Sequence, residues 1–150
     1  MASAVRKHCG DSAQTNGSGV KLYLDTSALV KLIVAESEST ALSDYLQRFA
    51  EDDLFTAALA RTELVRAVID GGPHAITQAR ALLESIDAVA LSRAVLDDAA
   101  TLPPPLLRTL DAIHLAAAQR AGTSLRAVVT YDGRMIEAAA ALGMPHASPT

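Results

Sequence analysis

Short apolar segments alternate with amphipathic helical segments along almost the whole sequence. Apolar runs of four or five residues suit strands buried on both faces, and apolar residues spaced by three and four suit helices packed on a sheet. Strands alternating with helices indicate parallel strands joined by crossover helices, which cover both faces of the sheet. We therefore predict an α/β fold, a three-layer α/β/α sandwich around a central, mainly parallel sheet. The predicted strands are residues 21–24, 54–57, 88–91 and 125–130, with an edge strand at 144–146. The predicted helices are residues 27–35, a segment within 36–53, 58–70, 74–86, a short helix capped by Ser92, 111–121 and 132–142.

The domain boundary lies close to the N-terminus. Residues 1–19 are rich in Ser, Gly, Asn and Gln and predict a disordered polar extension, in which we expect neither His8 nor Cys9 to bind a ligand. Residues 20–150 predict a single domain, and half of the 150 residues are hydrophobic, which is ample for a core. Cys9 is the only cysteine, and neither a membrane-spanning run nor a secretory signal is apparent, so we expect a cytoplasmic protein.

The net charge of −4 argues against a passive nucleic-acid binder. Binding to phosphates without chemistry requires a basic surface. An acidic sequence is compatible with a metal-dependent enzyme, because acidic ligands lower the formal charge and bound cations restore it.

Four carboxylates occur where a parallel sheet would bring them to one edge. Asp25 and Asp132 each follow a predicted strand and precede a helix, and Asp111 opens a helix after a turn. Glu63 lies inside a helix, near enough to the same edge to reach it. At separations of about 5 Å, each charged pair would repel by roughly 3 kcal/mol at an effective dielectric constant near 20. Such a cluster must hold protons or a cation, and oxygen ligands favour Mg²⁺ or Mn²⁺ over zinc.

Each acidic residue also has a purely structural interpretation. Asp25, Asp111 and Asp132 could cap helices or complement their dipoles. Glu63 could pair with Arg66 on the surface of one helix. The argument for a site depends on all four occurring in these contexts together.

The sequence resembles the PIN-domain nucleases and, among them, the VapC-type toxins of toxin–antitoxin pairs. The resemblance extends over about residues 20–146. It is carried by four segments in the family's order: Leu22-Tyr-Leu-Asp-Thr-Ser-Ala28, Arg61-Thr-Glu-Leu64, Leu110-Asp-Ala-Ile-His-Leu-Ala116 and Val129-Thr-Tyr-Asp-Gly-Arg134. The third and fourth segments are the most specific.

This resemblance implies a PIN-like sheet, a Mg²⁺ or Mn²⁺ site, endoribonuclease activity and a cognate VapB-like antitoxin that blocks the site. The residues that match the family's acidic quartet, and so its catalytic metal ligands, are Asp25, Glu63, Asp111 and Asp132. Ser27 and Thr130 match supporting hydroxyl groups.

Several further residues lie near these motifs. His114 could be a base or a ligand, but we expect it to pack or hydrogen-bond so as to steady the motif. Tyr131 could stack on a base. The candidates for contacts with RNA phosphates are Lys31, Arg61, Arg66, Arg108 and Arg134. Broad apolar faces on the helices at 37–50 and 74–86 would suit a homodimer and an antitoxin helix, although core burial explains most of their apolar character.

Two other functions remain open at this stage. A phosphatase of the haloacid-dehalogenase type would use Asp25 as a nucleophile, but it would have a second aspartate where Ser27 stands. A non-catalytic RNA- or protein-binding module would use the same motifs only to hold the fold. The hypothesis that we favour is a metal-dependent hydrolase that cleaves RNA phosphodiesters with a metal-activated water.

Overall fold

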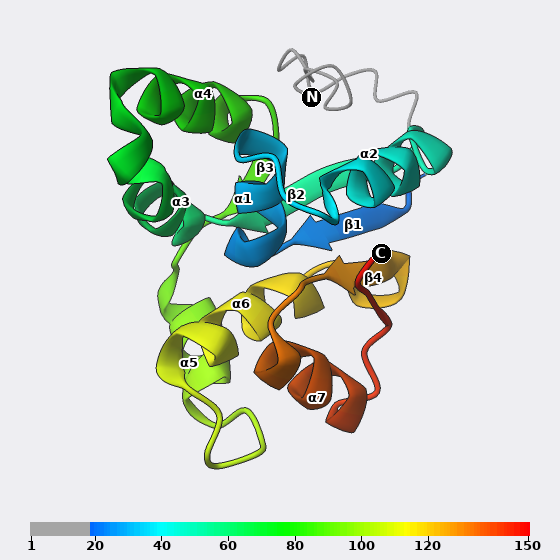
Figure 1. Ribbon diagram of the computed structural model, residues 1–150. Coiled ribbons are helices and arrows are strands. Elements are labelled where there is room, and N and C mark those ends of the chain that lie inside the picture. Colours follow the sequence, from blue (N-terminus) through cyan, green and yellow to red (C-terminus); the bar gives the residue numbers. More distant parts are fainter. Residues whose placement is uncertain (1–18) are drawn as a thin grey trace.

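A five-stranded sheet runs through the centre of the structure, a computed structural model that describes residues 19–150 (Figure 1). The expectations for residues 1–18, including those for His8 and Cys9, lie outside the described residues. The strands are β1 (Lys21–Leu24), β2 (Asp53–Ala57), β3 (Asp87–Val89), β4 (Leu125–Val129) and β5 (His146–Ala147).

All neighbouring strands are parallel, in the order β3-β2-β1-β4-β5. The chain therefore extends the sheet from β1 through β2 and β3 on one side, and then returns to add β4 and β5 on the other. The order reverses between β1 and β4. In open parallel sheets, ligands bind outside the carboxyl ends of the strands at such a switch point.

Seven α-helices cover the sheet within the described part of the chain. They are α1 (Thr26–Ile33), α2 (Ser39–Arg48), α3 (Ala60–Val68), α4 (Gly72–Glu84), α5 (Arg93–Ala100), α6 (Thr109–Gln119) and α7 (Gly133–Ala141). No helix between residues 19 and 150 is both long and apolar enough to cross a membrane.

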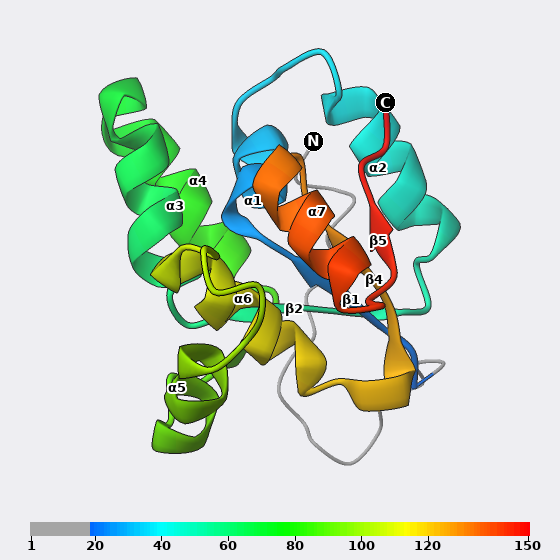
Figure 2. The ribbon, with the colours of Figure 1, turned by 90° about the horizontal axis from the view of Figure 1, so that it is seen from below.

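The helices form two layers, which confirms the predicted sandwich. Helices α1 to α4 lie on one face of the sheet and α5 to α7 on the other (Figures 1 and 2). Side chains of β1 alternate between the layers, as the pleat of a strand requires. Leu22 and Leu24 pack in the core with α1 to α4, whereas Tyr23 packs with α6 and α7. Helix α5 rests on α6 through Val95 and Ala99.

The apolar faces of the helices predicted at 37–50 and 74–86 serve the core. Leu42 and Leu46 of α2 are buried in it, and so are Leu82 and Leu83 of α4. Burial in the core therefore accounts for these apolar side chains. The most exposed large apolar side chain among the described residues is Leu106, 95 % exposed, in the segment between α5 and α6.

Several predicted boundaries need correction. The helix predicted at 58–70 ends earlier: α3 stops at Val68, a 3₁₀ turn follows, and α4 starts at Gly72 with Pro73 in its first turn, where proline is favoured. Thr56 lies in β2 and donates to the Leu24 carbonyl at 2.7 Å. Asp111 is the third residue of α6 rather than its cap, since the helix begins at Thr109. The edge strand near the C-terminus is confirmed as β5.

Candidate active site at the switch point of the sheet

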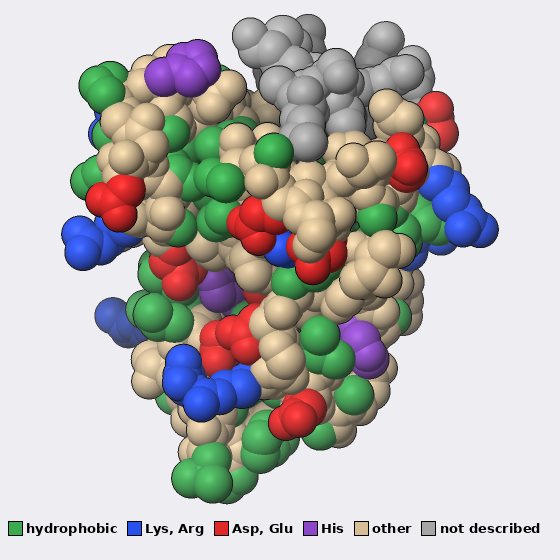
Figure 3. All heavy atoms as spheres, in the orientation of Figure 1, with side chains coloured by type: hydrophobic (Ala, Val, Ile, Leu, Met, Phe, Trp, Pro, Cys, Tyr) green, Lys and Arg blue, Asp and Glu red, His purple; other side chains and the backbone are tan. Residues whose placement is uncertain are grey.

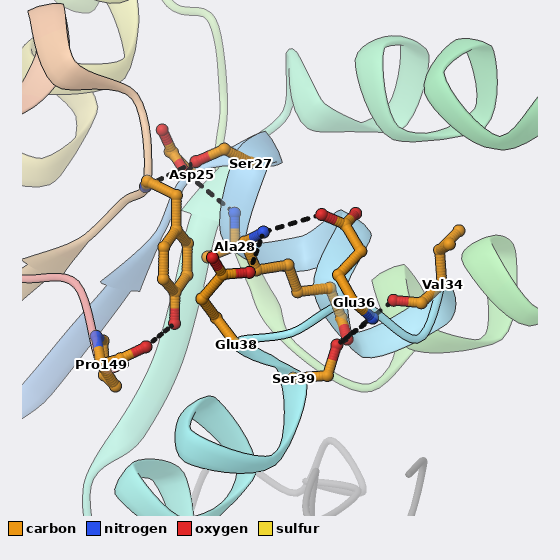
Figure 4. A network of polar contacts seen from close by, with 10 residues as sticks. Asp25, Ser27, Ala28, Val34, Glu36, Glu38, Ser39 and Pro149 are labelled. Carbon is orange, nitrogen blue, oxygen red and sulfur yellow. Dashed lines mark hydrogen bonds and ion pairs between the residues drawn. The ribbon is translucent and has the colours of Figure 1, made fainter.

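Asp25 lies at the centre of the site, directly after β1 and as the N-cap of α1. Its carboxylate accepts hydrogen bonds from the Ser27 hydroxyl at 2.6 Å, the Thr130 hydroxyl at 2.6 Å and the Ala28 backbone N–H at 3.1 Å (Figure 4 shows the Ser27 and Ala28 side of this network). Both Asp25 oxygens are thus held in place. The Asp25 carboxylate both caps the helix and accepts hydrogen bonds from the supporting hydroxyls, so the two interpretations of this motif are compatible.

The two hydroxyls also tie the first motif to the fourth. Ser27 Oγ accepts the Tyr131 backbone N–H at 2.9 Å, and Thr130 Oγ1 accepts the Asp132 backbone N–H at 3.1 Å. Each hydroxyl therefore donates to Asp25 and accepts from the turn between β4 and α7. Asp132 caps α7 through the Arg134 N–H at 2.9 Å.

Burial opposes the charge on Asp25. The side chain is only 3 % exposed, and burial raises the pKa of its carboxyl group, although the hydrogen bonds from Ser27 and Thr130 act in the opposite direction. An ionised Asp25 is thus only partly compensated by the protein's own donors. A positive charge at this edge would stabilise the ionised form.

Asp111 approaches the same edge from α6. Burial raises the pKa of its carboxyl group, and the negative charges of Asp132 and Asp25 raise it further. Its Oδ2 atom is buried without a hydrogen-bond partner among residues 19–150. The structure therefore brings Asp25, Asp111 and Asp132 into electrostatic contact, and it leaves one of their oxygens unsatisfied.

Glu63 is held by residues that are distant in sequence and not by Arg66, its predicted partner on the same helix. Its Oε1 accepts from the Thr26 hydroxyl at 2.8 Å and lies 2.5 Å from Nε2 of His114, rather than pairing with Arg66. Burial alone would raise the pKa of Glu63, but the interactions with His114 and Thr26 outweigh burial and hold it below its usual range. His114 is itself 3 % exposed, and its Nδ1 lies 2.6 Å from the Tyr23 hydroxyl. The expectation that His114 steadies the motif by hydrogen bonding is thus met.

The acidic residues do not form a closed metal cage. Within residues 19–150, no three His, Cys, Asp or Glu side chains converge tightly enough to enclose an ion. Mg²⁺ needs no such cage, because it keeps several waters and binds through one or two carboxylates. The all-oxygen donors and the orphaned Asp111 Oδ2 fit a hard divalent cation. Figure 3 shows acidic side chains gathered across the middle of this face, with basic side chains close below them.

The predicted phosphate-binding residues occupy different environments. Lys31 is 8 % exposed and pairs with Glu36 at 2.8 Å and Glu38 at 3.0 Å (Figure 4), and its ammonium group also lies over the Tyr131 ring. The loop after α1 brings two glutamates onto the amine, so an RNA phosphate would compete with them, and the RNA contact of Lys31 stays a prediction. The Tyr131 ring is engaged as well, since its hydroxyl donates to the Pro149 carbonyl.

The four arginines remain on the surface. Arg61 pairs with Glu84 at 3.3 Å, and Arg66 is exposed on α3. Arg108 and Arg134 line a groove of about 400 Å³ beside Asp111. The other side chains of this groove include Leu106, Leu107 and Glu137. The arginines nearest to the aspartates are thus those that flank α6 and α7.

Comparison with known proteins agrees with this arrangement. The family model for the PIN domain matches residues 22–141. Ribonuclease VapC46 of Mycobacterium tuberculosis is 47% identical over 129 residues, which span 86% of this chain and 98% of that protein. Ribonuclease VapC35 of the same species is 45% identical over 130 residues, 85% of this chain and 96% of the relative.

A solved structure shows the same fold. The crystal structure of M. tuberculosis VapC20, described as a sarcin-ricin loop cleaving toxin, superposes with a TM-score of 0.66 at 16% identity, covering 85% of this chain and 99% of that chain. The matched residues 22–141 include β2, β3, β4 and most of β1, as well as the four acidic residues and the two hydroxyl groups described above. The chain therefore belongs to the PIN-domain family and, within it, to the VapC ribonucleases.

Proposed function

We propose that the chain is a metal-dependent endoribonuclease, the toxin of a toxin–antitoxin pair, which hydrolyses RNA phosphodiesters. Membership of the VapC ribonucleases supports the reaction class. The observation that carries the proposal is the group of three coupled aspartates at the switch point, with the buried Asp111 Oδ2 unsatisfied. Such a group is stable in its ionised form only beside a cation.

The roles of the site residues follow from their positions. Asp25, Asp111 and Asp132, together with Glu63, would hold Mg²⁺ or Mn²⁺, and Ser27 and Thr130 orient Asp25. When bound, the ion lowers the pKa of a water and neutralises charge on the phosphate. The protein's own contribution is to fix the ligands before the substrate arrives, which the two hydroxyls do for both Asp25 oxygens.

The groove beside Asp111 is the proposed path for RNA. Arg108 and Arg134 present two positive charges next to the aspartates, and the exposed Leu106 offers an apolar surface for a base. Arg61 and Arg66 on α3 are candidates for contacts farther along the strand. Because phosphate contacts from Arg depend on ionic strength, binding through this groove should weaken with added salt.

A VapB-like antitoxin, a homodimer and action in the cytoplasm complete the proposal. The proposal of an antitoxin partner is supported by the relatives, which are VapC proteins. The surface that we propose for partner binding lies around α5 and α6. There Leu96, Leu106 and Leu110 are exposed, beside a groove of about 600 Å³.

A cleavage assay tests the catalytic proposal. A pool of structured RNAs is incubated with the purified chain in Mg²⁺, in Mn²⁺ and in EDTA, beside Asp25→Asn. Asp44→Asn, an exposed substitution on α2, is the matched control. We expect cuts that need both the metal and Asp25 and are unaffected in the control. Equal cutting by Asp25→Asn would refute the site, and metal-independent RNA binding without turnover would favour a binding module.

The phosphatase alternative gains no support from the geometry. Such an enzyme would have a second aspartate two residues after the nucleophile. Ser27 stands there instead, and its hydroxyl donates to Asp25 at 2.6 Å.

A further inference from the structure

Behind the aspartates, four side chains form one continuous hydrogen-bonded chain. It runs from Thr26 Oγ1 to Glu63 Oε1 at 2.8 Å, from Glu63 Oε1 to His114 Nε2 at 2.5 Å, and from His114 Nδ1 to the Tyr23 hydroxyl at 2.6 Å. Glu63 belongs to α3 in one helical layer and His114 to α6 in the other. The chain therefore links the two layers across the carboxyl edge of β1.

The contacts give this chain a direction. Oε1 of Glu63 accepts the Thr26 hydroxyl at 2.8 Å, and a carboxylate offers only acceptors, so Nε2 of His114 is the donor of the 2.5 Å contact. Nδ1 of His114 is then the acceptor for the Tyr23 hydroxyl at 2.6 Å. The arrangement selects the imidazole tautomer that donates to Glu63.

This geometry fixes one oxygen of Glu63 and leaves the other for the site. Oε1 receives two donors, from Thr26 and His114, so the plane of the carboxylate is set. His114 is itself buried, so this donor is held by the packing around it.

We propose that His114 is a positioning residue that holds Glu63 in the orientation needed to bind the divalent cation, and that Tyr23 fixes the tautomer of His114. The inference rests on the proposed function, because it concerns the same metal site. A histidine that only fills the core would affect stability without affecting the affinity of the folded protein for the metal. In metal sites, partners that orient a ligand change metal affinity by about 10–100-fold when they are removed.

The test is titration of Mn²⁺ alone into the full chain, stripped of metal by EDTA and free of RNA, with bound and free ion separated by electron paramagnetic resonance. His114→Leu removes the donor, and we expect about 10-fold or more weaker binding. His114→Gln keeps an N–H near the position of Nε2, and we expect affinity within about 3-fold of the wild type, since the donor survives. Tyr23→Phe should fall between the two. Circular dichroism establishes that each variant is folded.

A double-mutant cycle separates positioning from packing. In a Glu63→Gln background, His114→Leu should weaken Mn²⁺ binding no further, because the residue acts through Glu63. A full additional loss in that background would overturn the proposal. So would wild-type affinity in His114→Leu, or no Mn²⁺ binding by the wild type. If His114→Leu does not fold, the Mn²⁺ affinities of Tyr23→Phe and His114→Gln are compared with that of the wild type. An equal loss of affinity in both variants, or no loss in Tyr23→Phe, overturns the proposal.

Cleavage of the RNA pool distinguishes this inference from the proposed function. The expected ranking of Mn²⁺ affinities without any RNA cleavage would refute the function and leave the positioning role standing. Metal-dependent cleavage with equal Mn²⁺ affinity in all His114 and Tyr23 variants would support the function and refute the positioning role.

Discussion

Replacement of Thr130 by valine removes one hydrogen bond to Asp25 while keeping the shape of the side chain. Thr130 is fully buried, and its hydroxyl donates to Asp25 Oδ2 at 2.6 Å. A hydrogen bond to a charged group contributes about 1.5–3 kcal/mol, so Thr130→Val should lower the free energy of unfolding by roughly that amount at pH 7. Urea unfolding followed by circular dichroism in EDTA measures the loss.

Thr56→Val is the matched control for this prediction. Thr56 is equally buried, but its hydroxyl donates to the neutral Leu24 carbonyl at 2.7 Å. A neutral hydrogen bond contributes only about 0.5–1.5 kcal/mol, so the control should lose less stability than Thr130→Val. Equal or larger loss in Thr56→Val would refute the claim that Thr130 stabilises a buried carboxylate.

The pH dependence supplies an independent check on Thr130. Burial already places the pKa of Asp25 above its unfolded value, and without the hydroxyl that pKa must rise further. A carboxyl group with a raised pKa in the folded state destabilises the fold as pH rises from the unfolded value, about 3.9, to the folded value. The difference between Thr130→Val and the wild type should therefore be full above the folded pKa of Asp25 in the variant, and should be lost as pH falls through the folded pKa of Asp25 in the wild type, which lies above about 3.9. A difference independent of pH would contradict this account.

Four further predictions concern the charges of the site. Asp111→Asn should abolish cleavage yet raise the melting temperature in EDTA at pH 7, because it removes the repulsion of the Asp111 charge by Asp132 and Asp25. A melting temperature below that of the wild type would count against the coupling. Millimolar Mg²⁺ should raise the melting temperature of the wild type, as seen by calorimetry, and have little effect on Asp111→Asn. Lys31→Met should lower the free energy of unfolding by about 0.5–1 kcal/mol from the contact with the Tyr131 ring alone, and it should leave cleavage unchanged. Arg108→Ala should raise KM and reduce the dependence of KM on salt. Normal KM in Arg108→Ala would exclude the proposed RNA groove.

The parallel character of the sheet and the place of two aspartates could be predicted from local patterns. Apolar strands alternating with amphipathic helices require a parallel sheet, and a parallel sheet brings the residues after β1 and β4 to one edge. Asp25 and Asp132 follow from that rule alone. The hydroxyls of Ser27 and Thr130 came from family resemblance, and the structure adds that each one bridges Asp25 to the turn after β4.

Contacts between distant parts of the chain could not be predicted in this way. Spacing along a helix suggested Arg66 as the partner of Glu63, but surface pairs of that kind are worth only about 0.2–0.5 kcal/mol and lose to buried contacts. The actual partner, His114, lies 51 residues away in sequence. The ion pairs of Lys31 could not be predicted for a similar reason, since the path of the chain after α1, which folds Glu36 and Glu38 back onto it, leaves no local signature.

The origin of the attacking oxygen tests the central claim most directly. Cleavage of the RNA pool in water enriched in oxygen-18, with Mg²⁺ present, is followed by mass spectrometry of the new ends. Hydrolysis by a metal-activated water predicts linear terminal phosphates that carry one labelled oxygen, formed by the wild type and absent with EDTA or in Asp25→Asn. Unlabelled 2′,3′-cyclic phosphate ends would instead mean attack by the neighbouring ribose hydroxyl and would contradict the proposed mechanism.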